Sequence, residues 1–190
     1  MTEPQFIVAD IRAHRAELLE LNVEYVSWVI SHVADFFGIR AEDVVRMPTQ
    51  EYVEAVIDKT CGRNPPEGVF YLVKIDGQLA AMGGLRGLSP NLVEVKRIYV
   101  RPAFRGLRLG ERILKHLLTD AKLFGYDRVC LESAPFMKAA HRIYERASFV
   151  DRAPYQEAEV PVEFHGRWRF MERPLAAPAT IETPGSNCFL

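Results

Sequence analysis

The sequence predicts one mixed domain of the α/β (α+β) class, and three observations support this. Its 190 residues are 48% hydrophobic and 26% charged, which is enough to bury a single core. Two β-type runs meet at Asp76-Gly77, a pair typical of a tight hairpin turn. Between residues 92 and 124 a strand, a glycine-bearing loop and a helix follow one another.

The first third of the chain is expected to be mostly helical. After a short apolar segment at residues 6–9, apolar residues recur at helical spacing over residues 11–37, and Gly38 is a typical helix end. Thr49 has the character of an N-cap residue and predicts a second helix over residues 49–60. Residues 61–68 contain two adjacent prolines and read as a loop.

The remainder is expected to alternate between strands and helices. The predicted strands cover residues 69–75, 78–82, 92–100 and 128–133, with further β structure from Phe149 to about Arg173. The predicted helices cover residues 109–124, which Gly125 ends, and 137–146. From Pro174 the composition supplies little to bury, so we expect a domain at residues 1–173 and a flexible tail at 174–190.

Composition argues against several classes of function. Lys and Arg number 24 against 25 for Asp and Glu, so no overall positive charge attracts nucleic acid. No run approaches the roughly 20 apolar residues of a membrane span, and the first residues do not resemble a secretory signal. Cys61, Cys130 and Cys188 lie far apart and suggest no metal site. A cytoplasmic protein with reduced thiols is the expectation.

Residues 94–114 carry the strongest chemical signal. Backbone N–H groups at a turn that leads into a helix bind anions, and the helix dipole strengthens that binding. Gly106 and Gly110 would let a phosphate approach the backbone closely. Four guanidinium groups are expected around the turn, those of Arg101, Arg105, Arg108 and Arg112. These residues alone are compatible with a diphosphate site or with a solvated basic turn.

Two motifs add a family resemblance. The run Arg105-Gly106-Leu107-Arg108-Leu109-Gly110 resembles the acetyl-CoA signature of the GNAT superfamily of N-acetyltransferases, with Arg108 at the usual middle glycine. The run from Ala140 to Phe149 resembles the second marker of that family, with Ser148 where glycine is usual. The resemblance implies the GNAT fold, a mixed and mostly antiparallel central sheet of six to seven strands flanked by about four helices.

The same resemblance implies acetyl-CoA as the acyl donor. Its expected contacts are Ile98, Tyr99, Val100, Arg105, Gly106, Leu107, Arg108, Leu109, Gly110, Glu111 and His141. His141 lies three residues before Tyr144 and therefore on a neighbouring position of one helix face. The alternative for His141 is an exposed helix residue without a role.

Acyl transfer to an amine needs an acid for the departing thiolate and a base for the amine. Tyr144 matches the family position whose phenol reaches the cofactor sulfur; otherwise it is a tyrosine packed against the sheet. Strand alternation puts Glu94 on the same face as Ile98 and Val100, where a carboxylate could take the proton of the amine. The alternative is a strand glutamate paired with a neighbouring Arg or Lys.

By resemblance, the chain is an N-acetyltransferase that transfers an acetyl group to the primary amine of a small molecule by direct attack in a ternary complex. Two alternatives remain open, a protein or peptide N-acetyltransferase and a non-catalytic CoA-binding sensor module. In similar proteins the first two helices border the acceptor, which makes Tyr25, Trp28, His32 and Tyr52 candidate neighbours. Dimers are common among proteins of this kind, so a homodimer is a further expectation.

Overall fold

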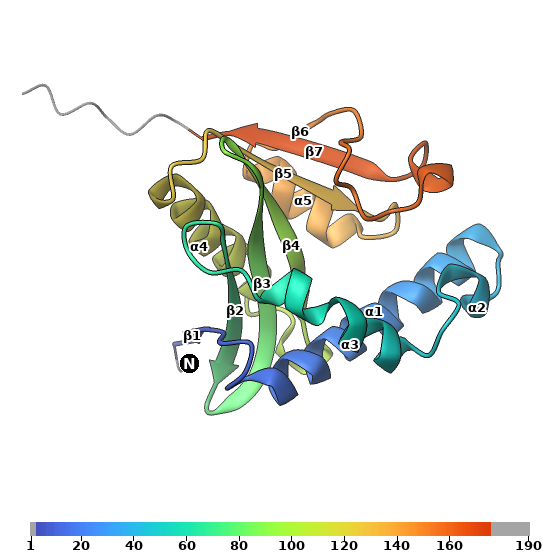
Figure 1. Ribbon diagram of the computed structural model, residues 1–190, viewed down its shortest axis with the longest axis horizontal. Coiled ribbons are helices and arrows are strands. Elements are labelled where there is room, and N and C mark those ends of the chain that lie inside the picture. Colours follow the sequence, from blue (N-terminus) through green and yellow to red (C-terminus); the bar gives the residue numbers. More distant parts are fainter. Residues whose placement is uncertain (1–2, 176–190) are drawn as a thin grey trace, which may run out of the picture.

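A seven-stranded sheet organises the computed structural model, which describes residues 3–175 (Figure 1). The strands are β1 (Gln5–Val8), β2 (Gly68–Ile75), β3 (Gln78–Ser89), β4 (Leu92–Val100), β5 (Arg128–Ser133), β6 (Val150–Asp151) and β7 (Arg169–Pro174). The helices are α1 (Arg15–Phe37), α2 (Ala41–Val44), α3 (Thr49–Cys61), α4 (Leu109–Leu123) and α5 (Lys138–Arg146), with 3₁₀ turns η1 (Pro102–Phe104) and η2 (Val162–Phe164).

The strand order is β1-β2-β3-β4-β5-β7-β6. Neighbouring strands are antiparallel except for β4 and β5, which are parallel. The chain returns from β4 to β5 through α4, as a parallel connection requires. The fold class predicted from the sequence, with its sheet of six to seven strands, is therefore confirmed.

Helices cover both faces of the sheet and build two main apolar cores. Alternating side chains of β2 contribute to both cores. Phe70 and Leu72 pack toward α1 and α3, whereas Val69, Tyr71 and Val73 pack toward α4. Both faces of β2 are thus buried, which explains its nearly continuous apolar sequence. None of the helices within residues 3–175 is long and apolar enough to cross a membrane.

A β-bulge interrupts the alternation of β4. Arg97 and Ile98 together lie opposite one residue of β3, Gly83, and Arg97 has a left-handed φ of 53°. The extra residue moves every later side chain to the other face. Ile98 and Val100 consequently pack in the same core as Val93 and Val95, which puts Glu94 on the opposite face. The prediction that Glu94 shares a face with Ile98 and Val100 is therefore wrong.

Strands β4 and β5 separate soon after they meet. Their pairing covers only Leu92–Glu94 against Arg128–Cys130, although both strands continue. Figure 1 shows β5, β7 and β6 turned across the top of the view, away from the direction of β2, β3 and β4. Among residues 3–175, no strand pairs with the last residues of β4 on their β5 side, and we call this opening the splay.

Most predicted elements are present, with shifted ends. The predicted first helix begins later, at Arg15, and Gly38 ends it with φ of 65° and an N–H bond to Ala34. Thr49 is the first helical residue and Pro48 the N-cap, which corrects the expected cap. The second hairpin strand runs on to Ser89. Of the predicted tail, Pro174 ends β7 and Leu175 is described; the remainder, with Cys188, lies outside the described residues.

Candidate active site

The turn between β4 and α4 presents a row of free backbone amides. Gly106 has φ of 84° and Arg108, the N-cap of α4, has φ of 56°. The first amide that bonds back into the helix is that of Arg112, to the carbonyl of Arg108 at 3.1 Å. Within the described residues, the N–H groups of residues 106–111 have no backbone acceptor, and no side chain caps the helix. This geometry suits an anion.

Not all four of the guanidinium groups expected around this turn are available to it. Arg101 is bound to Glu20 and Glu24 of α1, so its charge is neutralised there, and the prediction is wrong for this residue. Arg108 pairs with Glu111 at 2.6 Å, and Arg112 pairs with Glu3.

Arg105 is different. Its Nε donates a 3.3 Å hydrogen bond to the carbonyl of Val100, and no carboxylate pairs with it in the part of the chain that the structure describes. Arg105 is thus the member of the four whose charge is available to an anion at the turn.

The two glycines of the motif have different roles. A Cβ on Gly106 would meet open space, so the surface above this residue is open to a ligand. A Cβ on Gly110 would lie 3.3 Å from Cδ1 of Ile143 on α5. Gly110 therefore permits close packing of α4 against α5, which corrects the expectation that it makes room for a phosphate.

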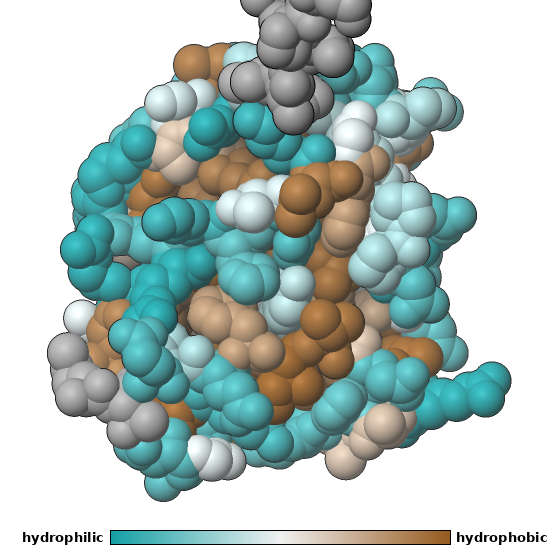
Figure 2. Space-filling view, turned by 90° about the vertical axis from the view of Figure 1, so that its left-hand side faces the viewer, coloured by the Kyte–Doolittle hydropathy of each residue, from teal (hydrophilic) through white to brown (hydrophobic). Residues whose placement is uncertain are grey.

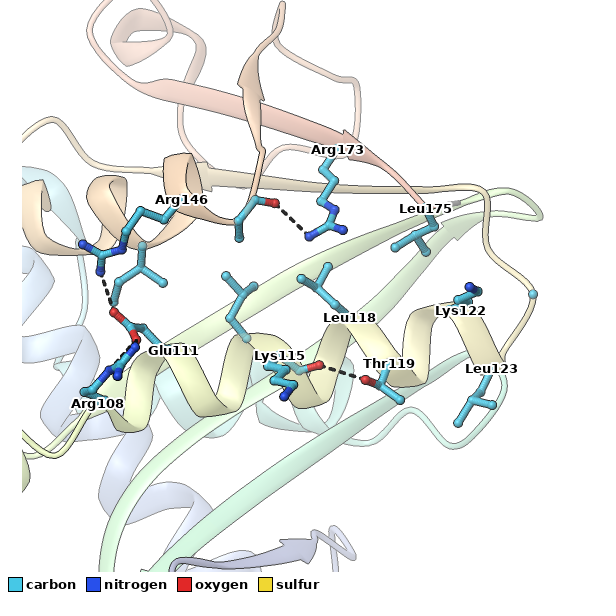
Figure 3. Close-up of a pocket in the computed structure, with 14 residues that line it drawn as sticks. Arg108, Glu111, Lys115, Leu118, Thr119, Lys122, Leu123, Arg146, Arg173 and Leu175 are labelled. Carbon is cyan, nitrogen blue, oxygen red and sulfur yellow. Dashed lines mark hydrogen bonds and ion pairs between the residues drawn. The ribbon is translucent and has the colours of Figure 1, made fainter. Parts of the chain in front are cut away.

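A groove of about 930 Å³ runs along α4 from the turn, between this helix and α5 (Figure 3). Figure 3 shows Leu118 pointing from α4 toward Leu175, and Glu111 bridging Arg108 and Arg146 at one end. Apolar surface also lies open among hydrophilic side chains on the face at the left of Figure 1, shown in Figure 2. The groove thus combines an apolar floor with a largely cationic rim.

Tyr144 lies on α5 with its ring buried. It packs in the core beneath α4, with its ring centroid 5.9 Å from that of Phe149. Burial, and secondarily the nearby Tyr25, raise the pKa of Tyr144 above its ordinary value. Its hydroxyl therefore keeps its proton at neutral pH. Tyr25 belongs to α1 and packs in the core on the opposite face of the sheet.

His141 is buried, which contradicts the alternative of an exposed helix residue. Its Nε2 lies 3.1 Å from Oγ of Ser133 at the end of β5. Burial lowers its pKa, and the charges of Arg169 and Lys138 lower it further. His141 is thus a neutral side chain that ties α5 to β5 beside the splay.

Glu94 is completely buried and has the partners that the second interpretation of the sequence gave it. Arg86 donates to its Oε2 from Nε at 3.0 Å and from Nη2 at 2.6 Å. The hydroxyl of Tyr155 donates to Oε1 at 2.6 Å, and Nζ of Lys96 lies 3.4 Å from the same oxygen. A carboxylate with both oxygens occupied in this way is held in place.

Two further carboxylates extend this ion-pair network. Nζ of the buried Lys96 lies 2.9 Å from Glu159 and 3.6 Å from Glu132. Burial disfavours the charge on Lys96, but the three carboxylates outweigh it and raise its pKa. Burial raises the pKa of Glu132, and the charge of Lys96 offsets part of this rise. The pKa of Glu159 is lowered, because Lys96 and Arg86 outweigh its burial.

Sequence reasoning missed most of this network. Arg86, Lys96, Glu132, Tyr155 and Glu159 come from four segments of the chain that only the fold brings together. A signal was present nonetheless, since Glu94, Lys96 and Glu132 interrupt strand sequences that are otherwise strongly apolar. Charged residues at buried positions usually pair with one another.

A pocket of about 350 Å³ opens above the network. Four charged residues of β4, β5 and the segment after them line it, namely Lys96, Arg97, Glu132 and Glu159. The other lining residues are aliphatic, aromatic or proline and come from α1, α2, α3, β4 and the segment around η2. They are Tyr25, Val26, Val29, Ile30, Val33, Val44, Val45, Tyr52, Val95, Val160, Pro161, Phe164 and Trp168. We call this cavity the acceptor pocket.

The four candidate acceptor neighbours separate into two pairs. Tyr25 and Tyr52 line the acceptor pocket. Trp28 and His32 are absent from its lining and stack on each other with ring centroids 4.4 Å apart. Phe136, from the segment before α5, packs against both rings. These two residues thus join α1 to the far side of the splay.

Comparisons with known proteins bear on the family and the fold of this chain. The family model described as "Acetyltransferase (GNAT) family" matches residues 33–149. An uncharacterized N-acetyltransferase of Schizosaccharomyces pombe is 32% identical over 51% of this chain and 61% of its own length. Another, YjgM of Escherichia coli, is 29% identical over 65% of this chain and 74% of its own. The PaiA N-acetyltransferase of Thermoplasma acidophilum, solved with coenzyme A, superposes with a TM-score of 0.62 at 13% identity, covering 90% of this chain and 99% of that one.

Proposed function

The chain belongs to the acetyltransferase (GNAT) family, and we propose that it transfers an acetyl group from acetyl-CoA to the primary amine of a small molecule, by direct attack in a ternary complex. The observation that carries this proposal is the acceptor pocket. It is enclosed on several sides, its volume of about 350 Å³ suits a small ligand, and residues of β4 and β5, the two strands that form the splay, contribute to its lining.

The described residues fit coenzyme A. The free amides of residues 106–111 and the charge of Arg105 would hold its diphosphate, with Gly106 leaving the approach open. The backbone of Ile98, Tyr99 and Val100 borders the splay and would hold the pantetheine arm there, with His141 nearby on α5. Acetyl-CoA supplies the activated acyl group as a thioester.

We assign the base to Glu132 instead of Glu94. Glu132 lines the acceptor pocket and its side chain is 13% exposed, whereas Glu94 is absent from the lining and has no exposed surface. A carboxylate with a raised pKa is a better proton acceptor at neutral pH than an ordinary one. In this proposal Glu94 positions Arg86 and Lys96 behind the pocket.

The proton balance then closes. The ammonium gives one proton to Glu132, and the free amine nitrogen forms a bond to the thioester carbonyl carbon. As the carbon–sulfur bond breaks, the sulfur takes a proton from Tyr144, which stays protonated because of its burial. The bonded nitrogen loses its second proton to water, so the products are an amide and free CoA thiol. The proton held by Glu132 then passes to the Tyr144 phenolate, which returns both groups to their starting state.

Release of CoA thiol in the presence of a panel of amines and peptides tests the activity. Tyr144→Phe should lower kcat while the rise in melting temperature with acetyl-CoA is retained; that rise corresponds to about 2.7 kcal/mol at 100 times the Kd. Tyr126→Phe is a matched control, because the Tyr126 hydroxyl bonds to the carbonyl of Pro66, away from the splay. An unchanged rate in Tyr144→Phe would remove this phenol from the mechanism.

A further inference from the structure

We infer that the acceptor is an α-amino acid with an apolar side chain. This inference rests on the proposed function and concerns the class of amine that the acceptor pocket takes. It is carried by three features of the pocket. These are its apolar walls, the excess of carboxylates over ion-paired cations in the network beneath it, and a guanidinium at its edge that has no carboxylate partner among the described residues.

The walls favour an apolar body. Thirteen of the lining residues are aliphatic, aromatic or proline, and the charged ones are confined to the part formed by β4, β5 and the segment before η2. A polyamine or an aminoglycoside would bring several ammonium or hydroxyl groups against aliphatic surface, and each polar group buried there without a partner is unfavourable. A ligand with one apolar end and one charged end matches this division.

The network beneath the pocket favours one ammonium. Arg86 and Lys96 provide two positive charges, whereas Glu94, Glu132 and Glu159 provide three negative charges. Lys96 is shared among all three carboxylates, so one negative charge has no ion-pair partner of its own, and the charge of Arg97 acts on Glu159 only at longer range. Two of these carboxylates, Glu132 and Glu159, line the pocket. An ammonium placed there completes the charge balance and lies beside the proposed base.

Arg97 favours a carboxylate on the same ligand. Its Nη1 donates to Oδ1 of Asn22 at 2.7 Å, and its guanidinium lies 5.9 Å from the centre of the Tyr25 ring. Among residues 3–175 no carboxylate pairs with it, although it lines the pocket. The guanidinium has donors beyond the one used by Asn22, and its planar fork suits a carboxylate. The bulge in β4 holds Arg97 next to the splay.

Together these groups orient an amino acid. The carboxylate binds Arg97, the ammonium lies against Glu132 and Glu159, and the side chain enters the apolar part of the pocket. The amine then lies beside Glu132, in the part of the pocket that β4 and β5 form.

The experiment compares L-phenylalanine, phenethylamine and spermidine as acceptors, with CoA thiol release as the readout. L-Phenylalanine and phenethylamine share the apolar body and the amine, and only the former carries a carboxylate. We expect kcat/KM in the order phenylalanine, phenethylamine, spermidine. Arg97→Gln should lower kcat/KM for phenylalanine about 10- to 100-fold and change that for phenethylamine little. Arg97→Lys should restore part of the loss, and Arg12→Gln on the surface should change neither substrate.

The melting temperature and the shift produced by acetyl-CoA separate the possible failures. A preference for spermidine or phenethylamine over phenylalanine would overturn the amino-acid inference and leave the acetyltransferase standing. Equal losses for both aromatic substrates in a folded Arg97→Gln protein would overturn the role of Arg97. If acetyl-CoA stabilises the protein but no amine or peptide releases thiol, the proposed function itself fails.

Discussion

Replacing Glu94 by glutamine separates a structural role from a catalytic one. The substitution keeps the shape of the side chain and removes a charge that is completely buried between Arg86, Lys96 and Tyr155. Breaking a buried ion pair from one side costs about 3–5 kcal/mol. The lower end applies here, because Glu159 still pairs with both cations and the amide oxygen can still accept from Tyr155.

For a domain of this size, 1 kcal/mol corresponds to about 2–4 °C in melting temperature. We therefore expect Glu94→Gln to melt about 6–12 °C below the natural protein in calorimetry or circular dichroism at pH 7. Glu54→Gln is the control, since Glu54 is exposed on α3 and bonds only to Gln50, and it should change the melting temperature little. An unchanged melting temperature with a lost kcat would refute our reasoning and return the base to Glu94.

Three further predictions follow from backbone geometry and charge. Ser148→Gly should raise the free energy of unfolding by about 1 kcal/mol and the melting temperature by about 2–4 °C, because Ser148 has a left-handed φ of 64°. Ala147→Gly is the control, since Ala147 has φ of −86° and should gain nothing from glycine. Equal effects of the two substitutions would exclude relief of strain. Arg105→Glu should abolish the thermal shift with acetyl-CoA, measured by differential scanning fluorimetry, and a retained shift would reject the diphosphate site at this turn. The kcat/KM should rise with pH in a limb that lies above pH 4.5, because Glu132 must lose its proton before it can act as the base. Its pKa is raised by burial, Glu94 and Glu159, against the lowering effect of Lys96. Glu132→Gln should remove that limb, and its persistence would point to another base.

The turn and its helix could be predicted because their signals are local. Arg108 and Ser148 both stand where glycine is usual in the family pattern. Both have left-handed φ values, 56° and 64°. The pattern therefore expresses a requirement of the backbone that a larger residue meets at some cost in strain. Cys61 and Cys130 are buried, and burial raises the pKa of each thiol to about 12.

The face of Glu94 could not be predicted in the same way. Strict alternation is a sound rule for a regular strand, but one extra residue at Arg97 inverts it for the rest of β4. The sequence between Glu94 and Val100 carries no signal that predicts the bulge, because it contains neither of the residues that often mark an irregular strand, proline and glycine. The partners Arg86, Glu132 and Glu159 are likewise separated from Glu94 along the chain, and only the sheet order brings them together.

The bulge and the ion-pair network act on the same point of the sheet. Pairing between β4 and β5 ends at Glu94, and the bulge follows three residues later. Without the bulge, alternation would turn Ile98 toward the acceptor pocket and Tyr99 toward α4. With it, Glu94 and Lys96 face the pocket side while Ile98 and Val100 close the core beneath α4. In the mechanism that we propose, a single inserted residue thus lets one strand present charge to the amine before the bulge and an apolar edge to the thioester after it. The reaction that we propose needs both within a few ångströms of each other.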